Sequence, residues 1–303
     1  MEAERIPLLR SLLRFALSPF VVAGLALGAG ATTYTWTGDG GDGAWETAAN
    51  WSTDDATTGY PSTTDATIVF GEVGEGTTNT VTITNTALKL ASLTLVKGVE
   101  LTLTNGANVT LSGSVLNNGG RLLLSSNTTF TCSCYTMTNE AYTLVRDATL
   151  KTTNTDDSFL WCSSGTPSDT LRFEGTKPSV TVSGFFASKL ANAVLNINFD
   201  VPKGGYSSAP LRHTKSYAMG TRWSITKPGK AYLNVSASRS VKSTDGTIAT
   251  VPLVSATYQI NTSYITAGDL PSKDSAFTGF TNGTKAIGVS IVLPAPGLIL
   301  LIR

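Results

Sequence analysis

The chain has 303 residues, enough for one large domain or two of ordinary size. Hydrophobic residues make up 41% of it, charged residues only 14%, and the formal net charge is +1. This balance argues against a disordered chain and is unusual for a cytosolic protein. Thr, Ser, Asn and Gly, which favour strands and turns over helices, fill the remainder. The composition therefore predicts a β-rich exported protein.

The N-terminal segment has the three parts of a secretory signal. Arginines come first, the apolar run Phe15–Leu27 follows, and Ala29-Gly30-Ala31 matches a small-residue cleavage site. The alternative is an uncleaved membrane anchor, but the apolar run is shorter than the roughly 20 residues of a spanning helix. We expect residues 1–31 to be a signal peptide and the protein to act outside the cell or on its surface. Nucleic acid is not an expected partner.

The stretch "TYTWTGDGGDGAWETAANW" follows at once and holds three tryptophans, Trp36, Trp45 and Trp51. Tryptophan faces can stack on sugars, which would make this a carbohydrate platform. The favoured interpretation is a structural cap, because the open end of a strand stack exposes core and unpaired backbone.

Asp39 and Asp42 lie in the glycine-rich part of the same stretch. Their carboxylates and the neighbouring carbonyls could supply oxygen ligands to Ca²⁺. The spacing does not match an EF-hand loop, and a turn with solvated aspartates is the favoured alternative. No other cofactor is expected.

A tract of short alternating segments then predicts strands, with Asn-Gly and Gly-Gly pairs between them. Thr94, Thr102 and Thr110 occupy matching places eight residues apart. Two architectures fit residues 81–153. Asn-Gly favours antiparallel hairpins in a sandwich, whereas degenerate repetition favours a parallel β-helix. We expect an all-β fold, with a β-helix-like region over 32–166.

The three cysteines are Cys132, Cys134 and Cys162. A disulfide between Cys132 and Cys134 would be strained, so we expect Cys162 to pair with one of the two. A zinc site is disfavoured because the chain has a single histidine, His213.

Longer alternating segments with more aromatic residues and prolines begin near Thr166-Pro167. They predict a second region over 167–286, an antiparallel sheet packed as a sandwich. Residues 287–303 form an apolar tail that ends in Arg303. It is too short to span a bilayer and is either a buried final strand or a sorting tail.

Charge is unevenly distributed along the chain. Residues 32–75 include eight acidic side chains and no basic one, whereas residues 175–242 include ten basic side chains and one acidic. The densest basic and aromatic run contains Arg212, Lys215, Arg222 and Trp223. It could bind an acidic polysaccharide by charge and stacking, or it is a solvated edge strand. Head-to-tail contact between copies of the chain is a further interpretation of the asymmetry.

The opening stretch and its continuation "GYPSTTDATIVF" resemble autotransporter-associated β-strand repeat proteins. The matching positions are Trp36, Gly38, Gly41, Trp45, Asn50, Trp51, Pro61 and Asp65. The resemblance implies a β-helical or β-rich exported surface protein of passenger type, usually without catalysis. We expect no C-terminal translocator barrel, because no length remains for one in this sequence, and Ala295 stands where a Pro-Glu-Pro sorting signal has Glu.

We therefore expect a non-catalytic surface or matrix protein whose stacked strands serve adhesion or display. The alternative is a carbohydrate-binding module for acidic polysaccharide. The third interpretation is a β-helical polysaccharide lyase or hydrolase, but the repeat tract shows no cluster of Asp with Lys or Arg on one face. Surface glycans or further copies of the chain are the expected partners, and membrane contact is limited to the signal peptide or the tail.

Overall fold

A computed structural model describes residues 32–55, 58–71, 78–84, 86–154, 158–161, 168–187, 193–215, 230–237, 250–261, 265–281 and 283–291. The chain divides into two compact units, Met1–Ala31 and Thr32–Arg303, and the description below concerns the second. The predicted signal peptide and most of the apolar tail lie outside the described residues. Those that are described form 25 strands and one short 3-10 helix, η1 (Ala48–Asn50).

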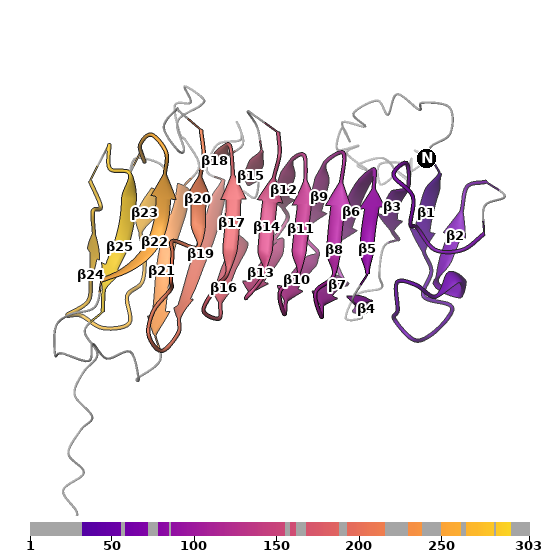
Figure 1. The fold of residues 1–303 in the computed structure, drawn as a ribbon, viewed down its shortest axis with the longest axis horizontal. Coiled ribbons are helices and arrows are strands. Elements are labelled where there is room, and N and C mark those ends of the chain that lie inside the picture. Colours follow the sequence, from indigo (N-terminus) through magenta and orange to yellow (C-terminus); the bar gives the residue numbers. More distant parts are fainter. Residues whose placement is uncertain are drawn as a thin grey trace, which may run out of the picture. The chain divides into compact units, whose positions relative to one another are not determined.

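The strands form three sheets (Figure 1). Sheet A has the order β18 (Phe185–Ala187), β15 (Phe159–Trp161), β12 (Tyr135–Thr138), β9 (Val115–Asn118), β6 (Ser92–Val96), β3 (Thr67–Phe70), β1 (Thr33–Trp36), β2 (Trp51–Thr53). Sheet B has the order β23 (Ile265–Ala267), β21 (Lys230–Ala237), β19 (Val194–Val201), β16 (Asp169–Glu174), β13 (Tyr142–Arg146), β10 (Arg121–Ser125), β7 (Val99–Thr104), β4 (Asn79–Thr84).

Sheet C completes the set. Its order is β24 (Ala276–Thr278), β25 (Ala286–Ser290), β22 (Thr250–Ala256), β20 (Leu211–His213), β17 (Ser179–Val182), β14 (Thr149–Thr152), β11 (Thr129–Cys132), β8 (Asn108–Leu111), β5 (Ala87–Leu90). From β3 to β20 the chain visits sheets A, B and C in rotation, so each strand pairs with the third one along. After β20 the strands return only to sheets B and C.

Nearly all of these pairings are parallel, which confirms an all-β fold with parallel sheets. Antiparallel pairing joins only β1 to β2, β22 to β25 and β24 to β25 among the described strands. The antiparallel sandwich predicted for 167–286 is therefore wrong for most of that region, because β16 to β23 pair in parallel. The three sheets also continue across the predicted boundary, through β13–β16, β14–β17 and β15–β18.

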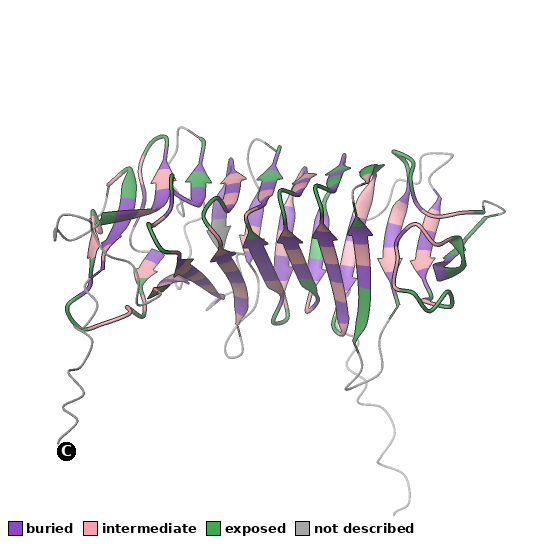
Figure 2. Ribbon diagram, turned by 60° about the horizontal axis from the view of Figure 1, so that its bottom comes forward, coloured by how far each residue is buried: buried purple, intermediate pink, exposed green. Residues whose placement is uncertain are grey.

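The physical reason for the error lies in burial. Each sheet has one buried and one accessible face, so its strands alternate between buried and accessible side chains, as β6, β19 and β8 show for sheets A, B and C (Figure 2). Alternation is usual for antiparallel sheets, because most parallel sheets are covered on both faces. In this chain the inward side chains of all three sheets instead join one continuous apolar core. The alternation thus reports exposure and not strand direction.

The Asn-Gly signal has a related explanation. Asn105 and Gly106 both adopt positive φ, and the N–H of Ala107 donates to the Thr104 carbonyl oxygen at 3.2 Å. This is the tight turn that the sequence predicts, but the flanking β7 and β8 diverge into sheets B and C. The turn forms a corner instead of a hairpin. The hairpin alternative for 81–153 is therefore excluded for the described strands of that tract, which pair in parallel.

Candidate functional site

Charged side chains are sorted by sheet. The strands of sheet A contain no Asp, Glu, Lys or Arg, and those of sheet B contain both signs. In the strands of sheet C the charged residues are Lys89, Lys151 and Arg212, all basic and all exposed. Among the described strands, those of sheet C are therefore the ones whose charged residues are all positive.

The three cations share one register. Consecutive in-register partners across sheet C define the basic row, which consists of Lys89, Thr110, Thr131, Lys151, Thr181, Arg212 and Ser255. At about 4.8 Å per strand, Lys89 and Lys151 lie roughly 14 Å apart, and Lys151 and Arg212 roughly 10 Å. Hydroxyl groups fill the positions between the cations.

A second row runs parallel to the first, two residues earlier in each strand. This row, called the hydroxyl row, consists of Thr129, Thr149 and Ser179, which carry hydroxyls, and of Asn108, which carries an amide. Between the two rows the strands send apolar side chains inward, for example Val109, Phe130 and Leu150. The period of two therefore places every polar side chain of both rows on the outer face.

The cations of sheet C have no acidic partner in the described part of the chain. The ion pairs found there join Glu100 to Arg121, Arg146 and Arg172 to Glu174, and Arg172 to Asp200, all on sheet B. On sheet B, acidic side chains neutralise the arginines. On sheet C, no described acidic side chain pairs with the cations.

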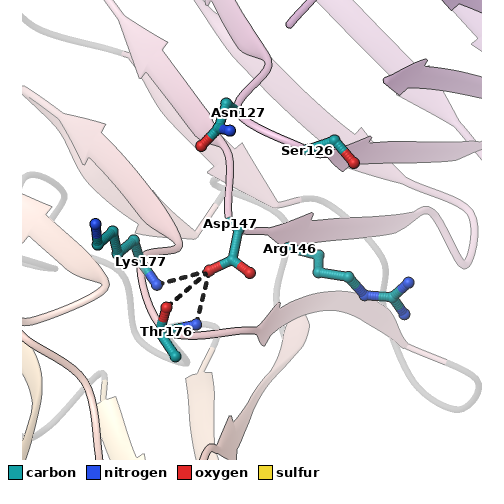
Figure 3. A pocket seen from close by; sticks show the side chains of 6 residues that line it. All are labelled: Ser126, Asn127, Arg146, Asp147, Thr176 and Lys177. Atoms are coloured by element: carbon teal, nitrogen blue, oxygen red, sulfur yellow. Dashed lines mark hydrogen bonds between the residues drawn. The ribbon is translucent and has the colours of Figure 1, made fainter. Parts of the chain in front are cut away.

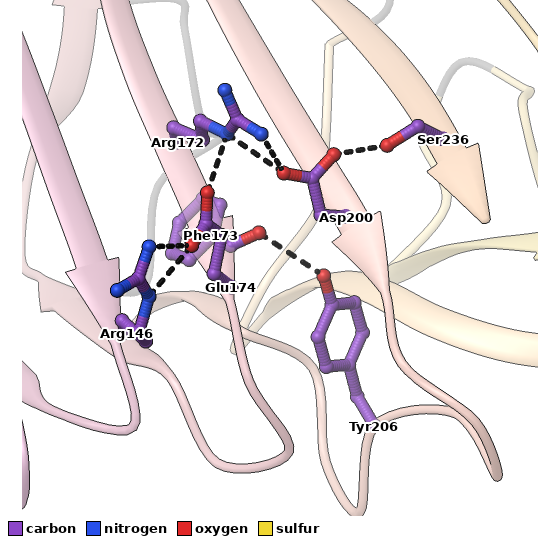
Figure 4. A network of polar contacts seen from close by, with 7 residues as sticks. All are labelled: Arg146, Arg172, Phe173, Glu174, Asp200, Tyr206 and Ser236. Atoms are coloured by element: carbon purple, nitrogen blue, oxygen red, sulfur yellow. Dashed lines mark hydrogen bonds and ion pairs between the residues drawn. The ribbon is translucent and has the colours of Figure 1, made fainter. Parts of the chain in front are cut away.

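The network on sheet B is shown in Figure 4. The Nε of Arg146 donates to Glu174 at 2.6 Å, and the Nε of Arg172 donates to Asp200 at 2.7 Å. Asp200 also accepts a hydrogen bond from Ser236. The arginines are about half exposed, so each pair contributes no more than about 1 kcal/mol. The main effect of the network is to neutralise this face.

A pocket of about 420 Å³ lies at the corner between sheets B and C (Figure 3). This corner pocket is lined by Ser126, Asn127, Arg146, Asp147, Thr176 and Lys177. Its geometry depends on Asp147, whose carboxylate accepts the backbone N–H groups of Thr176 at 2.7 Å and Lys177 at 2.8 Å. Asn127, Asp147 and Lys177 each stand two residues before a member of the hydroxyl row, so the pocket adjoins that row.

The predicted tryptophan cap is a buried aromatic cluster. Trp51 contacts Trp36 and Trp45 edge to face, with ring centroids 4.9 and 4.6 Å apart. The indole N–H of Trp45 donates to the Pro61 carbonyl oxygen at 3.0 Å. Because these rings are buried, they offer no flat face to a sugar.

The same segment covers the edge of sheet B. The N–H of Trp45 donates to the Thr82 carbonyl oxygen, and the N–H of Thr82 donates to that of Gly43. Strand β4 would otherwise be an open edge, which invites pairing with another chain. The placement fits a cap, because it satisfies backbone groups and buries the indoles together.

Asp42 is engaged within the protein. Hydrogen bonds from the Thr47 hydroxyl, the Ala44 N–H and the Asn50 amide lower the pKa of its carboxyl to about 2. Asp39 is exposed nearby. Among the described residues, no group of three or more His, Cys, Asp and Glu side chains is arranged to hold a metal ion. Calcium at Asp39 and Asp42 stays a prediction.

The predicted disulfide joins Cys162 to Cys132 or Cys134, and only the last two are described residues. Cys132 is a free thiol in the core, and burial raises its pKa, with a smaller contribution from Cys134. Cys132 is therefore not in a disulfide. Cys162, the expected partner, lies outside the described residues, and Cys134 is half-buried.

The predicted basic run is divided. Arg212 is on β20 and belongs to the basic row, and Lys215 follows that strand. Arg222 and Trp223 lie outside the described residues. Next to Arg212, His213 points into the core, where burial lowers its pKa to about 4. His213 therefore does not contribute to the outer face of sheet C, on which Arg212 lies.

Comparisons of this chain with protein families, curated proteins and solved structures found no match. No helix in the described part of the chain has the length and hydropathy needed to cross a membrane. The resemblance to autotransporter-associated repeat proteins stays a prediction.

Sequence reasoning missed Lys89 and Lys151 as companions of Arg212. They are far from it along the chain, and each stands alone among threonines and leucines. The available signal was the spacing of paired strands, 21 residues between Glu100 and Arg121 and 28 between Arg146 and Glu174. Because this spacing grows along the chain, a fixed repeat does not align the three cations.

Proposed function

We propose that the chain is an exported, non-catalytic scaffold whose strands coil as a parallel β-helix and whose outer faces serve adhesion or display. The observation that carries this proposal is the rotation of β3 to β20 through three parallel sheets around one core. Such stacking satisfies the backbone of each interior strand on both sides. It makes a rigid support for surface chemistry, as in other quasi-one-dimensional repeat architectures.

Export is tested on protein recovered from the cells that make it. We expect the mature chain to begin at Thr32, as read by N-terminal sequencing, and protease treatment of intact cells to release it. A chain that retains residues 1–31 and stays inside intact cells would overturn this part of the proposal.

The non-catalytic part is tested by incubation with acidic and neutral polysaccharides. We expect no new reducing ends and no unsaturated products. Either product would instead favour a β-helical lyase or hydrolase. The second candidate function, recognition of an acidic polysaccharide, is favoured by the basic row and is developed below.

A further inference from the structure

We infer that the outer face of sheet C binds a linear anionic polysaccharide, carboxylated or sulfated, which lies across the strands along the basic row. The inference rests on the proposed function only in that an exported scaffold meets such glycans. It assigns the ligand class and the face.

The charge of this face favours an anionic ligand. The strands of sheet C contribute Lys89, Lys151 and Arg212 and no carboxylate, and the ion pairs that join one described residue to another lie on sheet B. Cations without acidic partners in the protein attract an anionic ligand, because no neighbouring carboxylate competes with the ligand for them. The Arg212 guanidinium can in addition hold a carboxylate or sulfate through two hydrogen bonds.

The shape of the basic row favours an extended ligand. In-register parallel strands place the seven members of the basic row in a line perpendicular to the strands, roughly 29 Å long at 4.8 Å per strand. The hydroxyl row runs beside it. A line of this kind fits an extended chain and not a compact ligand.

The spacing of the cations distinguishes a polysaccharide from other polyanions. Double-stranded DNA carries about one charge per 1.7 Å, whereas the cations of the basic row are separated by roughly 10 to 14 Å. The intervening Thr110, Thr131 and Thr181 each offer a hydroxyl that both donates and accepts hydrogen bonds. Sparse charge alternating with hydroxyls is complementary to a glycan that keeps free hydroxyls beside its charges.

The corner pocket extends the same surface. It adjoins the hydroxyl row, and Lys177 brings a fourth cation to its wall. The Asp147 carboxylate is satisfied there by two backbone N–H groups and the Thr176 hydroxyl. A pocket of about 420 Å³ beside the row can accept a substituent that branches from the bound chain.

The test uses the purified full chain and four probes: polygalacturonate, dextran sulfate, neutral dextran and duplex DNA. The first variant combines Lys89→Gln, Lys151→Gln and Arg212→Gln. The matched control removes three exposed cations elsewhere, by Lys97→Gln, Lys230→Gln and Lys273→Gln. Circular dichroism and thermal melting verify that both variants fold.

We expect the wild type to bind polygalacturonate or dextran sulfate and not neutral dextran, with affinity that falls as salt rises. The sheet C variant should bind about tenfold or more weakly, because each of the three removed charges contributes modestly to affinity. The control variant should bind less than about twofold more weakly. Equal losses in both variants would overturn the inference, because the attraction would then be a property of the whole surface. Tighter binding of DNA than of either glycan would overturn the ligand class.

A second pair of variants separates hydroxyl contacts from charge. Thr131→Val removes a hydroxyl from the basic row, and Thr102→Val removes one from the outer face of sheet B. We expect only Thr131→Val to weaken glycan binding, and equal affinities would contradict a chain lying along the row.

Failure of this inference and failure of the proposed function are distinguishable. If no polyanion binds, the inference fails while export and the scaffold stand. If residues 1–31 are retained, the proposed function fails while glycan binding stands.

Discussion

At the scale of single residues, the polar side chains turned inward decide how the ends of the structure are held. Asn50 is fully buried and makes three hydrogen bonds, accepting from Gly40 N–H at 2.8 Å and donating to Asp42 at 2.7 Å and to the Ala44 carbonyl oxygen at 2.9 Å. One amide thereby ties together the glycine-rich loop that precedes the second and third tryptophans. In the sequence, Asn50 was marked only as one of the positions that resemble autotransporter-associated β-strand repeat proteins.

We expect Asn50→Ala to lower the free energy of unfolding by about 2 to 3 kcal/mol, because the three hydrogen bonds of a buried amide are lost. The pKa of Asp42 should rise toward its usual value, because Asn50 is one of its donors. Denaturant unfolding and carboxyl NMR titration measure the two effects. Asn108→Ala, at an exposed position on β8, is the control and should be near neutral. An unmoved Asp42 pKa would contradict the network.

His213 predicts a pH dependence of stability. Burial lowers its folded-state pKa to about 4, from 6.5 in the unfolded chain. Between these two values the imidazole is protonated in the unfolded state and neutral in the folded state, so falling pH favours unfolding. Stability is full above pH 6.5 and should fall by about 2 kcal/mol between pH 7 and pH 5, at about 1.4 kcal/mol per unit. Denaturant midpoints across this range measure it.

The matched variant is His213→Leu, whose stability should be flat between pH 7 and pH 5 whatever its absolute value. The carboxyl of Asp42 does not interfere, because its lowered pKa places its loss of stability at lower pH, between 3.8 and about 2. A slope that persists in the leucine variant would assign the effect to another group.

At the scale of elements, the turns between sheets B and C carry the local constraints. Asn105, Ser126, Asn127 and Asp147 all adopt positive φ, which is uncommon outside glycine. Short polar side chains tolerate this region because they bond to nearby backbone. Asp147 shows the benefit, since its carboxylate organises the next turn of the same corner. The turns thus specify the bend between sheets and the shape of the corner pocket.

Gly175 stands opposite that carboxylate. A Cβ at Gly175 would overlap the Asp147 carboxyl group, whereas a Cβ at Gly106 would meet nothing within 4 Å. Both glycines have positive φ, so Gly106→Ala should cost about 1 kcal/mol from backbone strain alone. We expect Gly175→Ala to cost more, by at least about another 1 kcal/mol, as Asp147 is displaced from its donors. Chemical denaturation of both variants compares them.

The double variant Gly175→Ala with Asp147→Ala isolates the contact. Its cost should be less than the sum of the two single costs, because the overlap exists only when both groups are present. Additive costs would show that Gly175 is required for its backbone conformation alone.

At the scale of the whole described unit, stability depends on which strands are paired on both sides. Strands β13 and β14 lie inside sheets B and C, whereas β2 and β24 are edge strands. Local opening requires fewer broken contacts at an edge than in the interior. The segment Gly43–Trp45 gives β4 extra backbone bonds that the other edges lack among the described hydrogen bonds.

Native-state hydrogen exchange should therefore rank the strands. We expect the slowest exchange in β13 and β14, intermediate exchange at Thr82 of β4, and the fastest exchange in β2 and β24. Mass spectrometry of peptic fragments is sufficient to resolve this order. Uniform protection along the chain would instead indicate a single cooperative opening.

Much of the fold was predictable from local patterns. The alternation of apolar and polar residues identified the strands, and Asn105-Gly106 identified a tight turn. At the candidate site, the sequence marked Arg212 as part of a basic run; the residue is exposed on β20, and its ligand-binding role stays a prediction. Lys89 and Lys151 were missed, because nothing near either residue in sequence marks it as the companion of Arg212.

The sequence by itself determined which residues are strands and which side of each strand is buried, since a period of two follows directly from strand geometry. Only the tertiary structure decided that the strands pair in parallel, that charge is sorted among three sheets, and that three separated cations share one row. Alternation is blind to strand direction when one face of every sheet is exposed. Register depends on turn angles and on neighbours a full circuit away, which no local window contains.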